Sequence, residues 1–163
     1  MLCGCGERAT IVCGDYLFIE SGLTNVTLRG VQLLTCAKCG AQTPALSKIN
    51  ELMQVIALAL VLKPSSLTGK EIRFLRKYSG FTGEQFGKKL GLTKEHVSRI
   101  ENQHHPVGAQ TDRLVRYLAV SAGSHLRKEM QKLFEQLETI KDDPVHERIE
   151  INLETGSFHY AAA

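Results

Sequence analysis

All five cysteines of this 163-residue chain precede Gly40, and their spacing suits a metal site. Zinc takes four tetrahedral sulfur or nitrogen ligands, with metal–sulfur bonds of about 2.3 Å. In the stretch Cys36-Ala-Lys-Cys39, two intervening residues let both thiolates reach one ion, and the following glycine permits the turn. The other half of the site is tighter, because one glycine separates Cys3 from Cys5.

These spacings predict one structural zinc ion per chain, bound by four of the five cysteines. The preferred ligands are Cys3, Cys5, Cys36 and Cys39. The alternative uses Cys13 and leaves Cys3 over; otherwise Cys13 is a strand residue or a free thiol. The extra thiol also keeps open a second function, that of a redox or metal sensor.

A second group of residues has the types and spacing of a DNA-reading surface. The segment TGEQFGKKLGLTKEHVSRIEN, residues 82–102, predicts two short helices joined at a glycine, the pattern of a helix-turn-helix. The second helix of this motif enters the major groove of DNA. Burial of Val97 and Ile100 turns the opposite face outward. There Arg99 can donate two hydrogen bonds to guanine, and Glu95 can accept one from cytosine.

Eleven residues are therefore predicted to contact DNA. Those of the second helix are Thr93, Lys94, Glu95, His96, Ser98, Arg99 and Asn102. Those that contact phosphates near the first helix are Thr82, Gln85, Lys88 and Lys89. Residues 63–120 contain eleven Lys or Arg against five acidic residues, whereas the whole chain has a net charge of +3. This positive central segment favours a polyanion as the partner.

Start and stop signals define the helices that position this surface. Capping boxes are predicted at Thr68 with Glu71 and at Thr82 with Gln85, and Thr93 is a further N-cap. Glycines and a proline end the helices, which are predicted over residues 69–78, 83–89, 94–102 and 109–121. The apolar residues expected to form their buried stripes are Ile72, Leu75, Phe86, Leu90, Leu92, Val97, Ile100, Leu114 and Leu118.

The flanking segments complete a predicted α+β fold. Residues 1–43 alternate like β-strands and form a small zinc-binding domain, which needs its metal for stability. Residues 44–66 form a linker helix that is apolar on nearly all sides in its second half. We expect a second copy of this helix to cover it, as a dimerisation element, although a core position or a place between two domains is the alternative.

Residues 67–121 form the helix-turn-helix domain, and residues 122–163 add an amphipathic helix and a β-hairpin. The helix places Leu126, Met130, Leu133 and Leu137 on one face, and the hairpin turns at 154–157. A lone hairpin is marginally stable. It should therefore dock on the N-terminal sheet or on a partner subunit.

Composition restricts the cellular setting and the class of activity. The longest apolar run, residues 53–62, is about half of the roughly 20 residues that a membrane span needs. The N-terminus lacks the pattern of a secretion signal, so we expect a soluble cytoplasmic protein with no membrane contact. No nucleophile–base pair, carboxylate pair or phosphate loop is evident, which predicts that the chain is not an enzyme.

The segment LTGKEIRFLRKYSGFTGEQFGKKLGLTKEHVSRIEN resembles the Xre/phage-repressor helix-turn-helix over about 50 residues. The resemblance implies an ion pair between an arginine of the first helix and a glutamate that ends the recognition helix, here Arg76 and Glu101. In that family a glycine usually follows the glutamate closely. This chain has Gln103 there, and a left-handed glutamine costs on the order of 1 kcal/mol. We therefore expect the loop to differ.

A cysteine-knuckle β domain, a linker helix and an Xre helix-turn-helix together resemble the MqsA/YgiT-type antitoxin and regulator family over roughly residues 1–120. The resemblance implies a structural zinc ion, a dimer that represses its own operon at a palindromic operator, and an N-terminal zinc domain that can bind a toxin. The expected function is that of a DNA-binding repressor and antitoxin of a type II toxin–antitoxin pair. A free-standing zinc-ribbon Xre regulator is the alternative.

Overall fold

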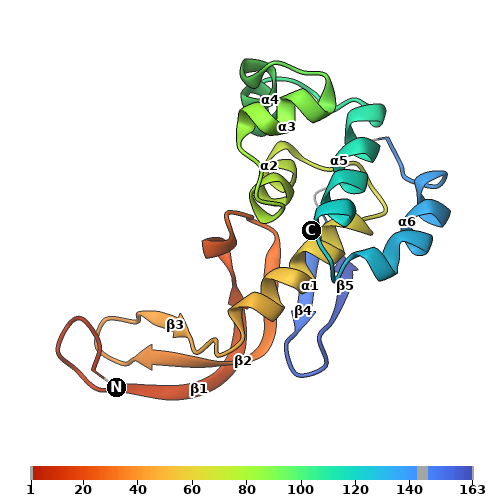
Figure 1. The fold of residues 1–163 in the computed structure, drawn as a ribbon. Coiled ribbons are helices and arrows are strands. Elements are labelled where there is room, and N and C mark those ends of the chain that lie inside the picture. Colours follow the sequence, from red (N-terminus) through yellow and green to blue (C-terminus); the bar gives the residue numbers. More distant parts are fainter. Residues whose placement is uncertain (1, 143–146, 163) are drawn as a thin grey trace.

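The computed structural model describes residues 2–142 and 147–162, which form a mixed α+β fold (Figure 1). Five strands make one sheet: β1 (Ala9–Leu17), β2 (Val26–Cys36), β3 (Gln42–Pro44), β4 (Arg148–Asn152) and β5 (Ser157–Ala161). The α-helices are α1 (Ile49–Val61), α2 (Gly69–Tyr78), α3 (Gly83–Leu90), α4 (Lys94–Glu101), α5 (Ala109–Ala122) and α6 (Met130–Leu137). Two short 3-10 helices are η1 (Ile19–Ser21) and η2 (Arg127–Glu129). Within the described ranges, none of the helices has the length and apolar character that spanning a bilayer requires.

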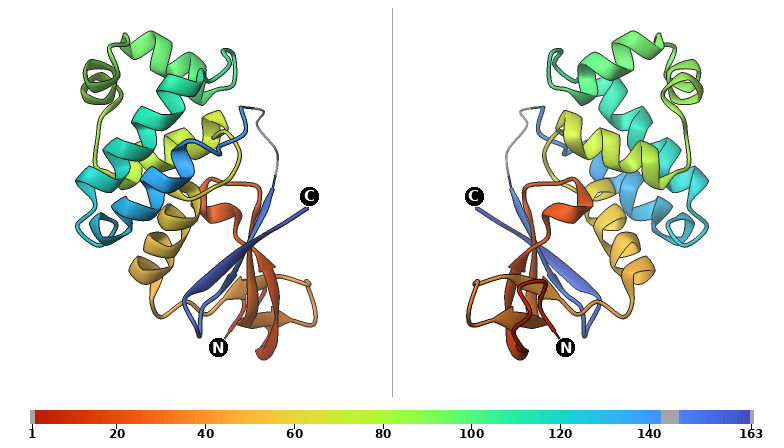
Figure 2. Two further views of the ribbon diagram at one scale, coloured as in Figure 1. Left: turned by 90° about the vertical axis from the view of Figure 1, so that its right-hand side faces the viewer. Right: turned by 90° about the vertical axis from the view of Figure 1, so that its left-hand side faces the viewer.

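The C-terminal hairpin docks on the N-terminal sheet. This sheet is one of the two docking sites that the sequence analysis predicted. The strand order is β1-β2-β4-β5, with β3 paired to the other end of β2. β2 and β4 run parallel, from Val26 opposite Ile149 to Arg29 opposite Asn152. Figure 2 shows the hairpin beside the first two strands, with α1 on one side of the sheet. Segments from both ends of the chain therefore build one sheet.

Glu150 joins these distant segments through contacts with Arg29 and His159. Its carboxylate accepts hydrogen bonds from the Arg29 guanidinium of β2, at 2.6 and 3.0 Å, and lies 2.7 Å from Nε2 of His159 on β5. The Arg29 hydrogen bonds, with a smaller contribution from His159, hold the pKa of Glu150 below its usual value of 4.5. The ionised carboxylate therefore stabilises the parallel junction of β2 and β4.

This depressed pKa predicts how stability changes in acid. The contribution of Glu150 is present above about pH 4.5 and is lost as the pH falls through the lower folded-state pKa. We expect Glu150→Gln to lower the melting temperature at neutral pH and to reduce the further drop between about pH 6 and pH 3. Glu154→Gln, in the exposed hairpin turn, is the matched control. Equal acid dependence in wild type and Glu150→Gln would contradict this role.

Helix α1 is covered by other parts of its own chain. The sequence analysis gave such a core position as an alternative to a dimerisation element. Ile56, Ala57 and Leu60 are fully buried, and the helix contacts β4 and β5 on one side and α2 and α5 on the other. The Tyr160 hydroxyl of β5 donates a 2.6 Å hydrogen bond to the Ala59 carbonyl. A second copy of α1 is therefore not needed to cover its apolar surface, and one buried cluster runs from the sheet through α1 into the helices.

A buried ion pair determines how α5 is oriented. Arg116 and Asp112, four residues apart, are both buried and joined by a 2.7 Å hydrogen bond. The inward face of α5 therefore carries Asp112, Val115, Arg116, Ala119 and Val120. The prediction that Leu114 lies in the buried stripe is wrong, because turning this charged pair inward leaves Leu114 exposed.

The predicted helix caps are confirmed. Thr68 and Thr82 each form a complete capping box, and Thr93 accepts a hydrogen bond from the backbone of His96. Left-handed glycines at 80 and 91 follow α2 and end α3. The tail is also amphipathic as predicted, with Leu126 and Leu133 buried, although it divides into η2 and α6 rather than forming one helix.

The loop after α4 keeps the left-handed turn, so the expected difference at Gln103 is wrong. Gln103 has φ of 62°, and its N–H donates to the Ile100 carbonyl at 3.0 Å. The N–H of His104 donates to the Arg99 carbonyl at 2.8 Å. These two bonds form a Schellman motif, the usual C-terminal helix cap in which glycine occupies the left-handed position. Here the hydrogen bonds hold glutamine in that conformation.

Replacing this glutamine with glycine should therefore stabilise the chain. We expect Gln103→Gly to raise the free energy of unfolding by about 1 kcal/mol, since glycine pays no Cβ penalty at positive φ. The same substitution at Gln54, on the exposed side of α1, should lower it by about 1 kcal/mol. Urea unfolding of both variants measures the two signs, and a loss of stability at both positions would contradict strain at Gln103.

Candidate functional site

Four cysteines meet at the free end of the arm that β1, β2 and β3 extend away from the helices (Figure 1). Cys36 ends β2, Cys39 lies in the following turn, and Cys3 and Cys5 precede β1. All four sulfurs lie within 4.8 Å of one another, and the pairs Cys3–Cys39 and Cys5–Cys36 are each 3.5 Å apart. This is the preferred ligand set predicted from the spacing.

Both loops have the backbone that a pair of thiolate ligands needs. The N–H of Gly6 donates to the Cys3 carbonyl, and the N–H of Gly40 donates to the Cys36 carbonyl, each at 2.9 Å. Gly6 and Gly40 have φ of 88° and 70°, values that other residues rarely adopt. The first turn closes between residues three positions apart and the second between residues four positions apart, so a tighter turn accommodates the one-residue gap between Cys3 and Cys5.

The sulfur positions fit a metal ion. Tetrahedral coordination with metal–sulfur bonds of about 2.3 Å places the sulfurs about 3.8 Å apart. That separation lies between the 3.5 Å of the closest pairs and the 4.8 Å limit of the cluster. It is much longer than the bond of about 2.0 Å in a disulfide. The four cysteines are free thiols that together could hold a metal ion.

Backbone N–H groups and neighbouring thiols shift the pKa values of Cys36 and Cys39 in opposite directions. N–H groups of Cys39 and Lys38 donate to the Cys36 sulfur and lower the pKa of that thiol to about 6. At Cys39 the Ala41 N–H acts in the same direction, but the neighbouring thiols outweigh it and raise the pKa of Cys39 to about 12. The Cys36 thiol thus ionises more readily than the Cys39 thiol. A bound cation would supply the charge that allows the remaining thiols to ionise.

Cys13 lies apart from this cluster. It is exposed on β1, and its thiol donates a 3.2 Å hydrogen bond to the carbonyl of Gly30 on β2. The alternative ligand set that included Cys13 is therefore wrong. The other prediction for this residue, a free thiol in a strand, is confirmed.

The eleven residues predicted to contact DNA form the outer surface of α3 and α4. His96 is half-buried, and the other ten are exposed: Thr82, Gln85, Lys88, Lys89, Thr93, Lys94, Glu95, Ser98, Arg99 and Asn102. Val97 and Ile100 are buried beneath them, as predicted. The two helices are joined by the three residues 91–93. The helix pair thus has the spacing and the exposed face that were expected.

Several of these side chains already have local partners. Thr82 and Gln85 cap α3, and the Asn102 amide donates to the Ser98 carbonyl at 2.9 Å. The Lys89 ammonium lies 5.2 Å from the centre of the Phe81 ring, and Lys88 pairs with the exposed Glu84. These contacts limit the conformational freedom of the side chains that make them. Arg99 is exposed in the last turn of α4.

The positive charge of residues 63–120 lies at the surface. Three of its cations form internal ion pairs: Lys63 with Glu71, Arg76 with Glu101, and Arg116 with Asp112. The pair between α2 and α4 is the one that the Xre resemblance implied. Each pair is neutral, so eight cations and two acidic residues remain on exposed or half-exposed positions. The surface therefore carries the whole excess of six positive charges.

Two glycines missed by the sequence analysis allow the helices to pack closely. A Cβ on Gly87 of α3 would lie 2.6 Å from the carbonyl oxygen of Leu92 in the turn before α4. A Cβ on Gly69 of α2 would collide with the carbonyl oxygen of Ile100. The sequence did hold a signal for Gly87. A glycine inside a predicted helix lowers the stability of that helix, so its presence indicates a close packing contact. Both residues fix the position of α4.

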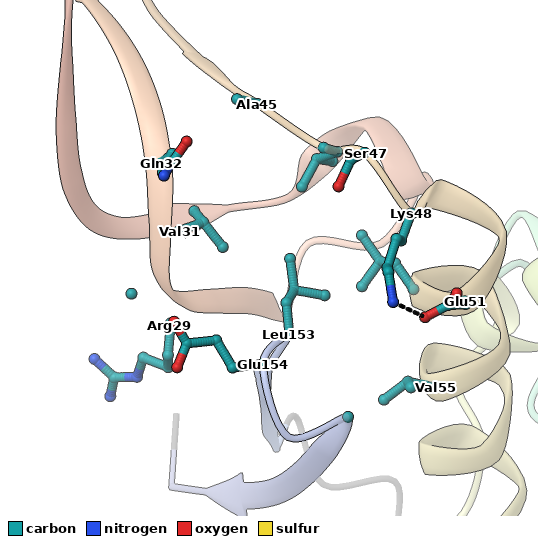
Figure 3. Close-up of a pocket in the computed structure, with 14 residues that line it drawn as sticks. Arg29, Val31, Gln32, Ala45, Ser47, Lys48, Glu51, Val55, Leu153 and Glu154 are labelled. Carbon is teal, nitrogen blue, oxygen red and sulfur yellow. Dashed lines mark ion pairs between the residues drawn. The ribbon is translucent and has the colours of Figure 1, made fainter.

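A cavity of about 340 Å³ lies between the sheet, the start of α1 and the β4–β5 turn (Figure 3). Val31, Leu153 and Val55 line it, while Lys48 and Glu51 pair with each other at 3.2 Å on its rim. The Arg29 guanidinium points away from the cavity, toward its acidic partners. Among the described lining residues, Arg29, Lys48 and Glu51 are thus already engaged in ion pairs.

Comparison with known proteins assigns no family. The chain matches no family model. No curated protein and no solved structure matches it either. The function is therefore inferred from the two sites described above, the cysteine cluster and the exposed face of α3 and α4.

Proposed function

We propose that this protein is a sequence-specific DNA-binding transcriptional repressor that acts as a homodimer and is stabilised by zinc. The exposed face of α4 carries the proposal. Its helix begins at a capped Thr93, its apolar side is buried, and its outward side holds Arg99 and Glu95 among surface cations. The resemblance to the Xre helix-turn-helix supports the same function. In this arrangement α4 enters the major groove and α3 contacts the flanking phosphates.

Zinc is the metal proposed for the cysteine cluster, with Cys3, Cys5, Cys36 and Cys39 as ligands. Four thiolates form a closed tetrahedral site, which is typical of structural zinc and leaves no position for a catalytic water. The ion would hold the N-terminal segment against the end of β2 and the following turn, which are otherwise joined there by the exposed ion pair of Lys38 with Glu7. We therefore assign it a structural role and propose no enzymatic activity.

A homodimer would let two α4 helices read a palindromic operator, with half-sites about 34 Å apart. Because α1 is largely covered within one chain, we place the dimer contact on another surface. Leu114 and Tyr117 of α5 are exposed, and so is Phe134 of α6. Such apolar residues on the helical domain support dimerisation there. Sedimentation of the free protein and of its DNA complex measures the number of chains per duplex.

The DNA proposal predicts different effects for two exposed cations. Arg99→Ala should reduce the preference for the operator by about 1–3 kcal/mol, since a bidentate contact with guanine carries sequence information. Lys88→Ala should weaken binding to all sequences alike and reduce the slope of log K against log salt by about 1. Selection from a random duplex library gives the operator, and fluorescence anisotropy then measures both variants on specific and scrambled DNA.

Thr10→Ala, on the exposed part of β1, is the control and should bind like wild type. An equal loss on specific and scrambled DNA for Arg99→Ala would remove Arg99 from the base-reading residues. Failure of the wild-type protein to enrich any sequence would overturn the proposal of a sequence-specific repressor.

We further propose that the N-terminal arm binds a toxin, which would make the protein the antitoxin of a type II pair. The arm exposes several large apolar side chains that its own sheet leaves uncovered: Leu2, Ile11, Val12, Leu17 and Ile19. Exposed apolar side chains gathered in one segment favour a protein-binding role for it. Expression of a small neighbouring gene alone and together with this chain tests the pairing. Growth arrest alone, rescue on co-expression and co-purification are expected; a harmless or non-binding neighbour contradicts it.

A further inference from the structure

A basic groove of about 400 Å³ separates α2 from η1 and its following turn. Lys70, Arg73 and Lys77 of α2 line one side, and Ser21 and Gly22 line the other. Asn102 and Gln103, the first residues after α4, also line the groove. We name this feature the α2 groove. Its three cations are not among the eleven residues that the sequence predicted to contact DNA.

The charges of the α2 groove are uncompensated within the described part of the chain. Lys70, Arg73 and Lys77 are exposed, and none of them forms an ion pair with a described acidic residue. Glu101 is the one acidic residue of the described lining. Its carboxylate already accepts two hydrogen bonds from Arg76, one of them 3.0 Å long. The groove therefore presents three positive charges and no free negative charge.

The spacing of the three cations suits a chain of phosphates. They stand at positions i, i+3 and i+7 of one helix, so they share a face and span about 10.5 Å along its axis. One strand of a duplex carries a phosphate about every 3.4 Å of the DNA axis. The face of α2 is therefore long enough to meet two or three successive phosphates, whereas a single small anion would occupy part of it.

The position of the groove connects it to the proposed DNA surface. Asn102 forms the C-cap of α4, and both it and Gln103 line the groove. A duplex seated on α4 extends past both ends of this short helix, and the α2 groove lies beside the C-terminal end. From this placement we propose that the α2 groove binds the phosphodiester backbone of the same DNA, outside the bases that α4 contacts. This inference rests on the proposed function as a DNA-binding protein.

Removal of the three charges tests the inference. The variant Lys70→Gln/Arg73→Gln/Lys77→Gln should keep its preference for operator over scrambled DNA but bind both more weakly. Its slope of log K against log salt should fall by up to about 2.7, or about 0.9 for each phosphate that the groove no longer neutralises. The matched control, Arg127→Gln/Lys128→Gln/Lys132→Gln, removes the same net charge from exposed positions on η2 and α6 and should change the slope much less.

A second variant and a second probe complete the test. Arg73→Gln alone should lower the slope by about one third of the triple change, with a melting temperature equal to that of wild type. Specific binding by wild type with equal slopes for the triple variant and its control would overturn the α2 groove while leaving the proposed function intact. Wild type that binds no sequence specifically would overturn both.

Calorimetry with ATP and with inorganic pyrophosphate distinguishes the source of the phosphate. DNA as the ligand predicts weak binding of both compounds and a large effect of the triple variant on the DNA salt slope. Tight binding of either compound that the triple variant abolishes, with an unchanged DNA slope, would show that the groove serves a small phosphorylated ligand. That outcome would also overturn the inference.

Discussion

Cys36→Ser should abolish stoichiometric metal binding and loosen the end of the arm while the helices stay folded. Cys36 is the buried member of the cluster, and its sulfur lies 3.5 Å from that of Cys5. Structural zinc sites in small domains bind with apparent free energies of about 10–16 kcal/mol at neutral pH, so removal of a ligand has a large effect. The helical core lies at the other end of the molecule and contains no cluster residue (Figure 1).

Two measurements separate the local effect from the global one. Elemental analysis should give close to one zinc per wild-type chain and much less for Cys36→Ser. Amide exchange should rise in residues 2–13 and 31–44 but stay unchanged in α1 and α5. Cys13→Ser is the matched control, because its thiol lies outside the cluster and should leave metal content unchanged. Metal loss in Cys13→Ser, or full retention in Cys36→Ser, would contradict the assigned ligand set.

The features predicted correctly from the sequence depend on neighbouring residues. A Cys-x-x-Cys-Gly turn and a capping box are complete within a few positions, so Cys36 with Cys39 and Thr68 with Glu71 could be identified without knowledge of the rest of the chain. The outward face of α4 followed in the same way from the helical period and the burial of Val97. These local signals gave the ligand set and the exposure of the candidate DNA surface.

The sheet topology depends on residues far apart in the chain. The parallel pairing of Val26 with Ile149 joins segments more than a hundred residues apart. The hairpin pattern predicted that residues 147–161 must dock, but nothing local selects β2 over a partner subunit. The same docking also covers α1. Strands β4 and β5 of the hairpin contact one side of this helix, and Tyr160 of β5 donates a hydrogen bond to it. The sequence analysis favoured a second copy of α1 as the cover because this docking gives no local signal.

Buried charges were the other source of error. Arg116 and Lys63 are fully buried, although lysine and arginine are almost never fully buried unless paired. The sequence analysis counted both as part of the positive central segment. Lys63 donates to both carboxylate oxygens of Glu71, at 3.0 and 3.1 Å, in the capping box of α2. From the sequence alone, a buried lysine or arginine that donates internal hydrogen bonds cannot be distinguished from one at the surface.

Arg116→Met should therefore be one of the most destabilising single substitutions in the helical part. The guanidinium donates to carbonyl oxygens of Val61, Lys63 and Ser65 at 2.6–3.0 Å, which fixes the connection between α1 and α2. Methionine fills a similar volume but leaves these carbonyls without their donor and Asp112 without its counter-charge. Removal of one partner of a buried ion pair costs about 3–5 kcal/mol of unfolding free energy.

Urea unfolding measures this decrease against Arg113→Met, a change of the same chemistry on a half-exposed position of α5. The control should shift the free energy of unfolding by no more than about 0.5 kcal/mol, as surface substitutions usually do. Asp112→Asn tests the same pair from the other side, because the amide oxygen can still accept the 2.6 Å hydrogen bond from the Leu67 N–H while Arg116 loses its counter-charge. Both buried variants should be far less stable than Arg113→Met. Equal stability of Arg116→Met and Arg113→Met would mean that the orientation of α5 does not depend on the buried pair.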